Sequence, residues 1–280
     1  MICSSRAVVV ALLLPALARA APAPADAVFG SNVHEVHAAE IAGIAGVAMG
    51  ALAVEAFWHA PDPAHWTGPI LFDGAARDAF RAGTASGRYN ASTASSVGQF
   101  LLVLYPAIVD AGAVTWLSKG KGDVAVRLAL IDAEAFAVTG LLTAVTQRAV
   151  GRERPFAQGC GTGTNPACGS PDGRNTSLFS GHTSFAFTGA AVLCVQHSRL
   201  DLYGSADPFV CPVALLLASA TGILRMVADR HWASDVIAGA AMGGAVGTVV
   251  SIAHISKDPA ASVTASGSAN SPAASFAFRF

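Results

Sequence analysis

The sequence predicts an all-α protein, a bundle of six helices embedded in a membrane. Hydrophobic residues make up 53% of its 280 residues, charged residues only 12%, and the mean hydropathy is +0.51. Soluble domains carry about 25% charged and 45–50% apolar residues. The apolar residues also fall into segments with helical periodicity, several near the ~20 residues that span a bilayer. The net charge of −1 offers no basic surface, so nucleic acid is not an expected partner.

The N-terminus has the pattern of an export signal. Residues 1–20 combine an early positive charge, an apolar core over 8–14 and a small-x-small cleavage site at 18–20. An uncleaved anchor is the alternative, but the apolar run is short and Pro15 interrupts it. Residues 21–37 then form a Pro/Ala-rich leader.

The helical domain is expected over 38–255, with its core over 97–253 and a flexible Ser/Ala-rich tail over 256–280. In the last helix, small residues at four-residue spacing allow another backbone to approach closely: Gly239, Gly243 and Gly247. The six segments expected to be helical are 38–58, 97–118, 122–150, 182–197, 209–228 and 232–253.

The first and third helices carry ionisable residues within apolar sequence. Glu40 and Glu55 make the first segment a poor membrane span, whereas Asp132 and Glu134 of the third are expected to form structural pairs. Between the first two helices, residues 59–96 are polar and rich in Pro, Gly and Ser, with a short surface helix expected over LFDGAARDAFRAG. The histidines outside the motifs described below are expected on the surface or in loops: His34, His37, His59, His65, His197 and His254.

Cleavage of the signal leaves four cysteines, an even number that permits disulfides in an exported chain. Cys160 and Cys168 lie in one glycine-rich loop and form the disulfide candidate. Cys194 and Cys211 flank another loop, and they either pair or serve as small buried apolar residues.

Three clusters of polar residues lie at helix ends, and each alone has an ordinary structural reading. Basic residues after the third helix complement its dipole, a serine before the fourth helix caps it, and a His–Asp pair opens the sixth helix. The residues of the clusters are Arg152, Arg154, Pro155, Ser180, Gly181, His182, Arg225, His231 and Asp235.

Taken together, the clusters predict phosphoryl transfer without a metal. The free N–H groups of a helix N-terminus bind anions, and arginines bind oxyanions through two parallel hydrogen bonds. His231 and Asp235 are four residues apart, so they share a face if the helix begins near His231, and the carboxylate then fixes the imidazole tautomer. One histidine can attack phosphorus while the other protonates the leaving oxygen.

These residues give the chain a resemblance to the type-2 phosphatidic acid phosphatase family, which includes bacterial acid phosphatases and vanadium haloperoxidases. The family signature is Lys, six residues, Arg-Pro; then Pro-Ser-Gly-His; then Ser-Arg, five residues, His, three residues, Asp. The match covers roughly residues 97–253, in the same order and at the same spacing. The matching positions are Arg154-Pro155, Ser180-Gly181-His182, Arg225, His231 and Asp235.

The resemblance implies a role for each matching residue. His231 would be the nucleophile that forms a phosphohistidine, Asp235 would orient it, and His182 would protonate the leaving group and later activate water. The phosphoryl oxygens would be bound by Arg154, Arg225, Ser180 and Gly181.

Three positions depart from the family signature: Gln147, Phe179 and Leu224 replace lysine, proline and serine. Gln147 matters most, because losing a charge-assisted contact in a desolvated site costs about 2–4 kcal/mol of transition-state stabilisation. Arg148 and Arg152 are the candidates to compensate, although Arg148 lies about 100° further round the helix.

The expected function is a phosphatase acting on a lipid phosphate or a related phosphate monoester, without metal or cofactor. The alternatives are an exported, soluble acid phosphatase of broad specificity and a catalytically impaired membrane scaffold. The expected partners are the phosphorylated substrate and the membrane.

The active site is expected on the extracytoplasmic side. Lys119, Lys121, Arg199 and Lys257 lie at the ends opposite the three clusters, as the positive-inside rule requires. A cleaved signal followed by three spans would place Arg154 in the cytoplasm instead, so the first segment is expected not to span.

Overall fold

The computed structural model describes residues 29–160 and 166–257. In these ranges, helices are joined by loops, and the only β-structure is two isolated bridges. All six predicted helices are present. Two short helices add to them, giving eight α-helices in the described ranges. The long helices are α1 (Ala38–Phe57), α3 (Ala85–Tyr105), α4 (Gly122–Val150), α6 (Gly181–Arg199), α7 (Asp207–Val227) and α8 (Ala233–His254); the short ones are α2 (Asp73–Phe80) and α5 (Pro171–Arg174).

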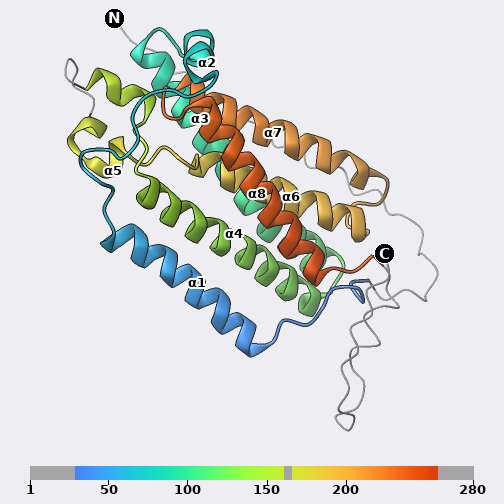
Figure 1. Ribbon diagram of the computed structural model, residues 1–280. Coiled ribbons are helices and arrows are strands. Elements are labelled where there is room, and N and C mark those ends of the chain that lie inside the picture. Colours follow the sequence, from blue (N-terminus) through green and yellow to red (C-terminus); the bar gives the residue numbers. More distant parts are fainter. Residues whose placement is uncertain (1–28, 161–165, 258–280) are drawn as a thin grey trace, which may run out of the picture.

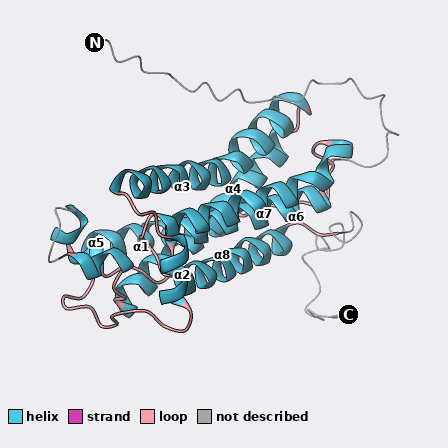
Figure 2. Cartoon of the chain, turned by 90° about the horizontal axis from the view of Figure 1, so that it is seen from above, coloured by secondary structure: helices cyan, strands magenta, loops and turns pink. Residues whose placement is uncertain are grey.

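The long helices form one bundle with α6 at its centre (Figure 1). Helix α6 packs against α3, α4, α7 and α8, whereas α1 lies on the outer side of α4 (Figure 1). In Figure 2, α6, α7 and α8 run side by side, and α2 lies near the end where α8 begins. The C-terminal ends of α4 and α7 therefore meet the N-terminal ends of α6 and α8.

The glycines of α8 let it pack closely on α6, as their spacing predicts. A Cβ at Gly243 would overlap the carbonyl group of Ser184, and one at Gly247 would overlap the carbonyl of Thr188. The hydroxyl of Thr188 also donates to the Gly243 carbonyl, at 3.1 Å. This close contact fixes the middle of α8 against the first half of α6, which begins with one of the sequence motifs.

The second long helix begins twelve residues earlier than predicted. Helix α3 starts at Ala85, with the Thr84 hydroxyl accepting a hydrogen bond from the Gly87 backbone N–H, and continues as a π-helix, η1 (Pro106–Ser118). Its first half was assigned to a loop because serine, glycine and asparagine favour turns. These polar residues are helical because one face of α3 contacts the polar clusters of α6 and α7.

Among the described residues, five helical segments are long and apolar enough to cross a membrane: α1, α3 with η1, α4, the segment Gly204–Val227, and α8. Large hydrophobic side chains on these helices remain exposed, among them Leu52, Leu117 and Leu216 at 68–79%. Helix α1 is one of the five, and it buries none of its own residues. The expectation that it does not span therefore has no support from its length and composition.

The described part of the leader is packed at the end of the bundle away from the motifs. Val33 is 2% exposed, pairs with Ile255 in a β-bridge and joins the hydrophobic cluster around Leu128. The predicted signal, residues 1–20, and residues 258–280 of the predicted tail lie outside the described residues.

Both cysteine pairs form disulfides. Cys160–Cys168 is confirmed as predicted, with a Cα–Cα distance of 5.5 Å. Cys194 and Cys211, left open by the sequence, also pair and tie α6 to the start of α7.

The prediction that His197 lies on the surface is wrong. His197 is 6% exposed, and its two ring nitrogens face Asp207 at 2.5 Å and Asp110 at 3.2 Å. Asp132 and Glu134 do form structural pairs: Gln196 donates to Asp132 at 2.7 Å, and Glu134 lies 3.5 Å from His254.

Candidate active site

The three motif clusters converge at the end of the bundle where α6 and α8 begin. The Ser180 backbone N–H donates to the Asp235 carbonyl at 3.2 Å, which joins the second cluster to the third. The backbone N–H of Phe156, in the turn after Arg154, donates to the Asp229 carbonyl at 3.2 Å, which joins the first to the third. The fold thus places side chains from distant parts of the sequence in one small volume.

His231 lies in the loop between α7 and α8 and is 3% exposed. Its Nδ1 lies 2.8 Å from the backbone carbonyl oxygen of Ser177. A carbonyl only accepts, so Nδ1 must carry the proton and Nε2 has the free lone pair. This is the tautomer that a nucleophilic Nε2 requires.

Asp235 does not bond to His231, contrary to the expected direct contact. Helix α8 begins at Ala233, so His231 lies before it and the four-residue spacing does not place the two side chains on one helical face. The carboxylate accepts hydrogen bonds from the Ser177 hydroxyl at 2.5 Å and from the Trp232 backbone N–H at 3.0 Å. Asp235 is therefore connected to His231 through Ser177, whose carbonyl holds the imidazole.

Asp235 is also part of a buried charge chain. Arg152 donates to Asp235 at 2.5 Å and to Asp73 at 2.7 Å, and all three side chains are fully buried. The Arg152 guanidinium lies 4.2 Å from the ring centre of Trp66. Asp73, from α2, also accepts from the backbone N–H of Ser234, at 2.8 Å.

Asp73 was not predicted as a site residue. Burial alone would raise its pKa, but hydrogen bonds, chiefly from Ser234 and also from Arg152, hold the pKa below its ordinary value. The carboxylate is therefore charged and anchors both Arg152 and the first turn of α8. In the sequence, Asp73 is distinguished only by its position in the predicted short surface helix.

Serines of α3 line the site beside His182 and Arg225. Ser96 Oγ lies 3.1 Å from Nε2 of His182. Arg225 donates to the hydroxyls of Ser92 and Ser95, both at 3.2 Å. These serines were missed, and their i, i+3, i+4 spacing within the Ser-rich stretch was the available signal.

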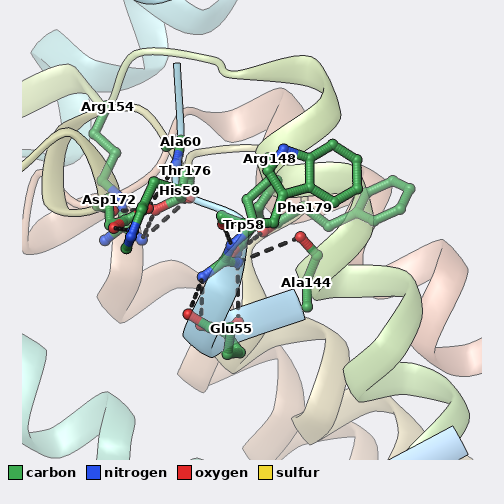
Figure 3. Close-up of polar contacts among 11 residues, drawn as sticks. Glu55, Trp58, His59, Ala60, Ala144, Arg148, Arg154, Asp172, Thr176 and Phe179 are labelled. Atoms are coloured by element: carbon green, nitrogen blue, oxygen red, sulfur yellow. Dashed lines mark hydrogen bonds and ion pairs between the residues drawn. The ribbon is translucent and has the colours of Figure 1, made fainter. Parts of the chain in front are cut away.

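Two arginines of the site have no carboxylate partner among the described residues. Arg154 donates to the carbonyl and hydroxyl of Thr176, at 3.1 and 3.0 Å (Figure 3), and Arg225 contacts only the α3 serines. In both, Nε is buried and unpaired. Unneutralised guanidiniums at the edge of an apolar bundle form a site for an oxyanion.

Ser180 occupies the predicted N-cap position of α6, but its hydroxyl pairs with the hydroxyl of Thr183 at 2.8 Å instead of capping the backbone. Gly181 is the first residue of α6 and is partly exposed. The N–H groups at this helix start therefore carry no side-chain cap from Ser180, as an anion site requires.

Gln147 lies at the site but is already engaged. Its Nε2 donates to the Phe179 carbonyl at 2.7 Å. Arg148 does not compensate: Figure 3 shows it turned toward α1, where it pairs with Glu55 at 2.6 Å. Arg152 is occupied by Asp73 and Asp235, so neither predicted substitute reaches the phosphate position.

The pKa values at the site follow from burial and from these cations. Burial, then the charges of Arg154 and Arg225, hold the pKa of His231 well below its ordinary value, so its imidazole is neutral. Burial, then the charge of Arg230, lower the pKa of Arg154 to about 10. The site thus pairs a neutral imidazole with charged guanidiniums.

Within the described ranges, the residues suited to holding a metal ion gather elsewhere. Glu40, Glu134 and His254 bring their ligand atoms within 4.8 Å of one another. They lie on α1, α4 and α8, toward the end of α8 opposite the motif residues.

Comparisons with known proteins agree with the motifs. Residues 128–257 match the family model described as the PAP2 superfamily. A lipid A 1-phosphatase of Porphyromonas gingivalis is 35% identical over 129 residues, which are 46% of this chain and 24% of the relative. The chain therefore matches about a quarter of the length of that curated relative. No solved structure matches it.

Proposed function

Because residues 128–257 match the family model of the PAP2 superfamily, we propose that the protein is a metal-independent phosphatase for a lipid phosphate or a related phosphate monoester. One observation carries the proposal: Arg154 and Arg225 meet no carboxylate among the described residues and lie beside two histidines. A phosphate dianion would neutralise both guanidiniums. The helix start at Gly181 and the Ser180 position would add backbone donors.

In the first step, Nε2 of His231 attacks phosphorus. Its lone pair forms the P–N bond while the bond from phosphorus to the ester oxygen breaks. Burial, then the charges of Arg225 and Arg154, lower the pKa of His182 to about 3. The charge of the bound phosphate would offset these cations, so that His182 can carry a proton and give it to that oxygen, and the product leaves as an alcohol. The Ser177 carbonyl, in a residue held by Asp235, keeps the proton on Nδ1 of His231 through both steps.

In the second step, water hydrolyses the phosphohistidine. His182, now neutral, takes a proton from the water as its oxygen attacks phosphorus. The P–N bond breaks, its electron pair returns to Nε2 of His231, and inorganic phosphate is released. Arg154 and Arg225 stabilise the charge on the phosphoryl oxygens in both steps.

A lipid substrate is favoured over a soluble one by the surface of the bundle. Exposed apolar side chains cover the five candidate spans, which indicates membrane association. The lipid A 1-phosphatase relative acts, by its name, on a lipid phosphate. An exported soluble acid phosphatase would have no use for this surface.

We place the site on the extracytoplasmic side because Lys119, Lys121, Arg199 and Lys257 lie toward the other end. With this facing, Val33 and Ile255 are cytoplasmic, whereas a cleaved export signal requires the N-terminal segment outside. A fluorescent protein fused after Phe280 should fold in the cytoplasm, and sequencing of the mature N-terminus reports on cleavage. A non-fluorescent but intact fusion would contradict the proposed facing.

The activity is tested on purified full-length protein in detergent, with EDTA present. We expect hydrolysis of phosphatidate or of a lipid A phosphate, with less activity on a soluble aryl phosphate. Phosphorus-32 from the substrate should be trapped on wild type in an alkaline quench, and His231→Ala should lose both the label and the activity.

Each other outcome rejects a defined part of the proposal. Loss of activity in EDTA rejects metal independence, and activity retained by His231→Ala rejects the nucleophile. Preference for the aryl phosphate in protein that is soluble without detergent favours the soluble acid phosphatase. Wild type that hydrolyses none of these esters would be the catalytically impaired scaffold.

A further inference from the structure

The site contains a cation outside the family signature, Arg230. Its backbone N–H donates to the Arg225 carbonyl at 3.0 Å, so the two arginines leave the same turn at the end of α7. Its guanidinium lies 5.2 Å from the ring centre of Phe156, two residues after Arg154. His231 follows directly in the sequence. Arg230 therefore lies among Arg154, Arg225 and His231.

The turn that carries Arg230 is held from α2. Asp229 adopts a left-handed conformation, with φ +58°, and its carboxylate is 1% exposed. Arg77 and Arg81 occupy that carboxylate at 2.7 and 2.8 Å. Asp229, the acid next to Arg230 in the sequence, is therefore already paired. Arg230 forms no ion pair with any described residue. Partial burial of the guanidinium lowers the pKa of Arg230, which nonetheless stays cationic.

The site also lacks the charge that the family signature supplies at position 147. The Gln147 amide is bonded to the Phe179 carbonyl, and the Cβ of an alanine at Gly181 would lie 3.7 Å from its Nε2. Position 147 therefore lies beside the start of α6, where the phosphoryl group is expected. Arg148 and Arg152 are paired elsewhere, whereas the charge of Arg230 acts on His182, the residue that follows Gly181.

We propose that Arg230 contacts the phosphoryl group of the substrate and supplies the positive charge that Gln147 does not. The inference rests on the proposed phosphatase function. Three guanidiniums with no carboxylate partner among the described residues repel one another, and a phosphate dianion removes this repulsion. Arg230 is partly exposed, so a substrate that approaches from solvent can reach it.

The test measures binding of inorganic phosphate and of orthovanadate to the full-length protein by calorimetry, together with hydrolysis. Arg230→Gln should lower the binding affinity for both anions by about 10- to 100-fold, the usual effect of losing a charge-assisted hydrogen bond. Arg230→Lys should lose less, because it retains the charge. Arg88→Gln is the matched control: Arg88 is also partly buried at this end and donates to the Ala82 carbonyl.

A second variant separates a binding role from a structural one. Gln147→Lys should restore anion binding about 10-fold in the Arg230→Gln background. A lysine at 147 cannot replace the contact with Phe156, so a merely structural loss would not be rescued. Unchanged anion binding in Arg230→Gln, an equal loss in Arg88→Gln, or no rescue would each overturn the inference.

These failures differ from failure of the proposed function. If Arg230→Gln binds phosphate and hydrolyses esters like wild type, the proposed function stands but Arg230 does not contribute to it. If wild type itself binds no phosphate or vanadate and hydrolyses no ester, the proposed function fails, and this inference fails with it.

Discussion

Buried histidines lie at both ends of the bundle, in opposite electrostatic surroundings. At one end, His231 is surrounded by Arg154 and Arg225, which meet no carboxylate among the described residues. At the other, His197 lies between Asp110 and Asp207. The second cluster contains its own counter-charges, whereas the first has none among the described residues, which is why we propose that it binds an anion. Charge balance, rather than the presence of histidine, separates the proposed binding site from the structural network.

The largest expected effect is on stability, at the acidic end. His197→Ala removes the imidazole between two buried carboxylates and leaves Tyr203 as their remaining donor, which should lower the free energy of unfolding by about 3–5 kcal/mol. Denaturation in detergent measures this, and phosphate hydrolysis per folded molecule should be unchanged. A selective loss of turnover in folded protein would mean that the two ends are coupled.

Arg225→Met tests the cationic end. We expect kcat/KM to fall about 10²- to 10³-fold, the cost of removing one preorganised donor. The free energy of unfolding should not fall, because the substitution also removes repulsion from Arg154. If Arg225→Met instead destabilises the protein as strongly as His197→Ala, the cationic cluster is structural.

Asp73→Asn tests the chain that reaches His231 from α2. The neutral amide weakens the hold on Arg152, so Asp235 and Ser177 lose their fixed geometry. We expect kcat to fall about 10- to 100-fold, as for other supporting residues behind a reacting group, with KM little changed. Asp78→Asn on the same helix is the control. An equal loss of kcat in both variants would mean that Asp73 acts only through the folding of α2.

Gln147→Lys adds a positive charge to the cationic end. The added charge should raise phosphate affinity, or hydrolysis, by up to about 10-fold. Competitive inhibition by phosphate gives the affinity directly. A clear loss would mean that the hydrogen bond from Gln147 to Phe179 has its own role in shaping the loop.

The smallest effect is a shift in titration. Because the pKa of His231 is depressed, its imidazole should remain neutral as pH falls through 6.5, where the unfolded chain takes up a proton. This group therefore destabilises the fold progressively below that pH. Nitrogen-15 NMR of labelled histidines, with His231→Asn to assign the signal, measures the midpoint. A midpoint at or above 6.5 would contradict the depressed pKa.

The sequence predicted the six long helices and the residues of the family signature, because apolar periodicity and motif spacing are local properties. It did not predict that α3 begins at Ala85, since the serines that bind Arg225 resemble a loop when read alone. The partner of Asp235 was also missed. Ser177 reaches it only because the loop before α6 folds back over α8, a tertiary contact that spacing does not encode.

The site also depends on residues outside the segment that matches the family. Helix α2, over Asp73–Phe80, lies well before residue 128, yet Asp73 holds Arg152, and Arg77 and Arg81 hold Asp229. The unit that can be exchanged between relatives is therefore larger than the matched segment. A chimaera that transfers residues 128–257 alone would leave Arg152 with one of its two carboxylates and Asp229 with neither of its arginines. One that also carries α2 and α3 would keep the loop that contains His231 together with the residues that support it.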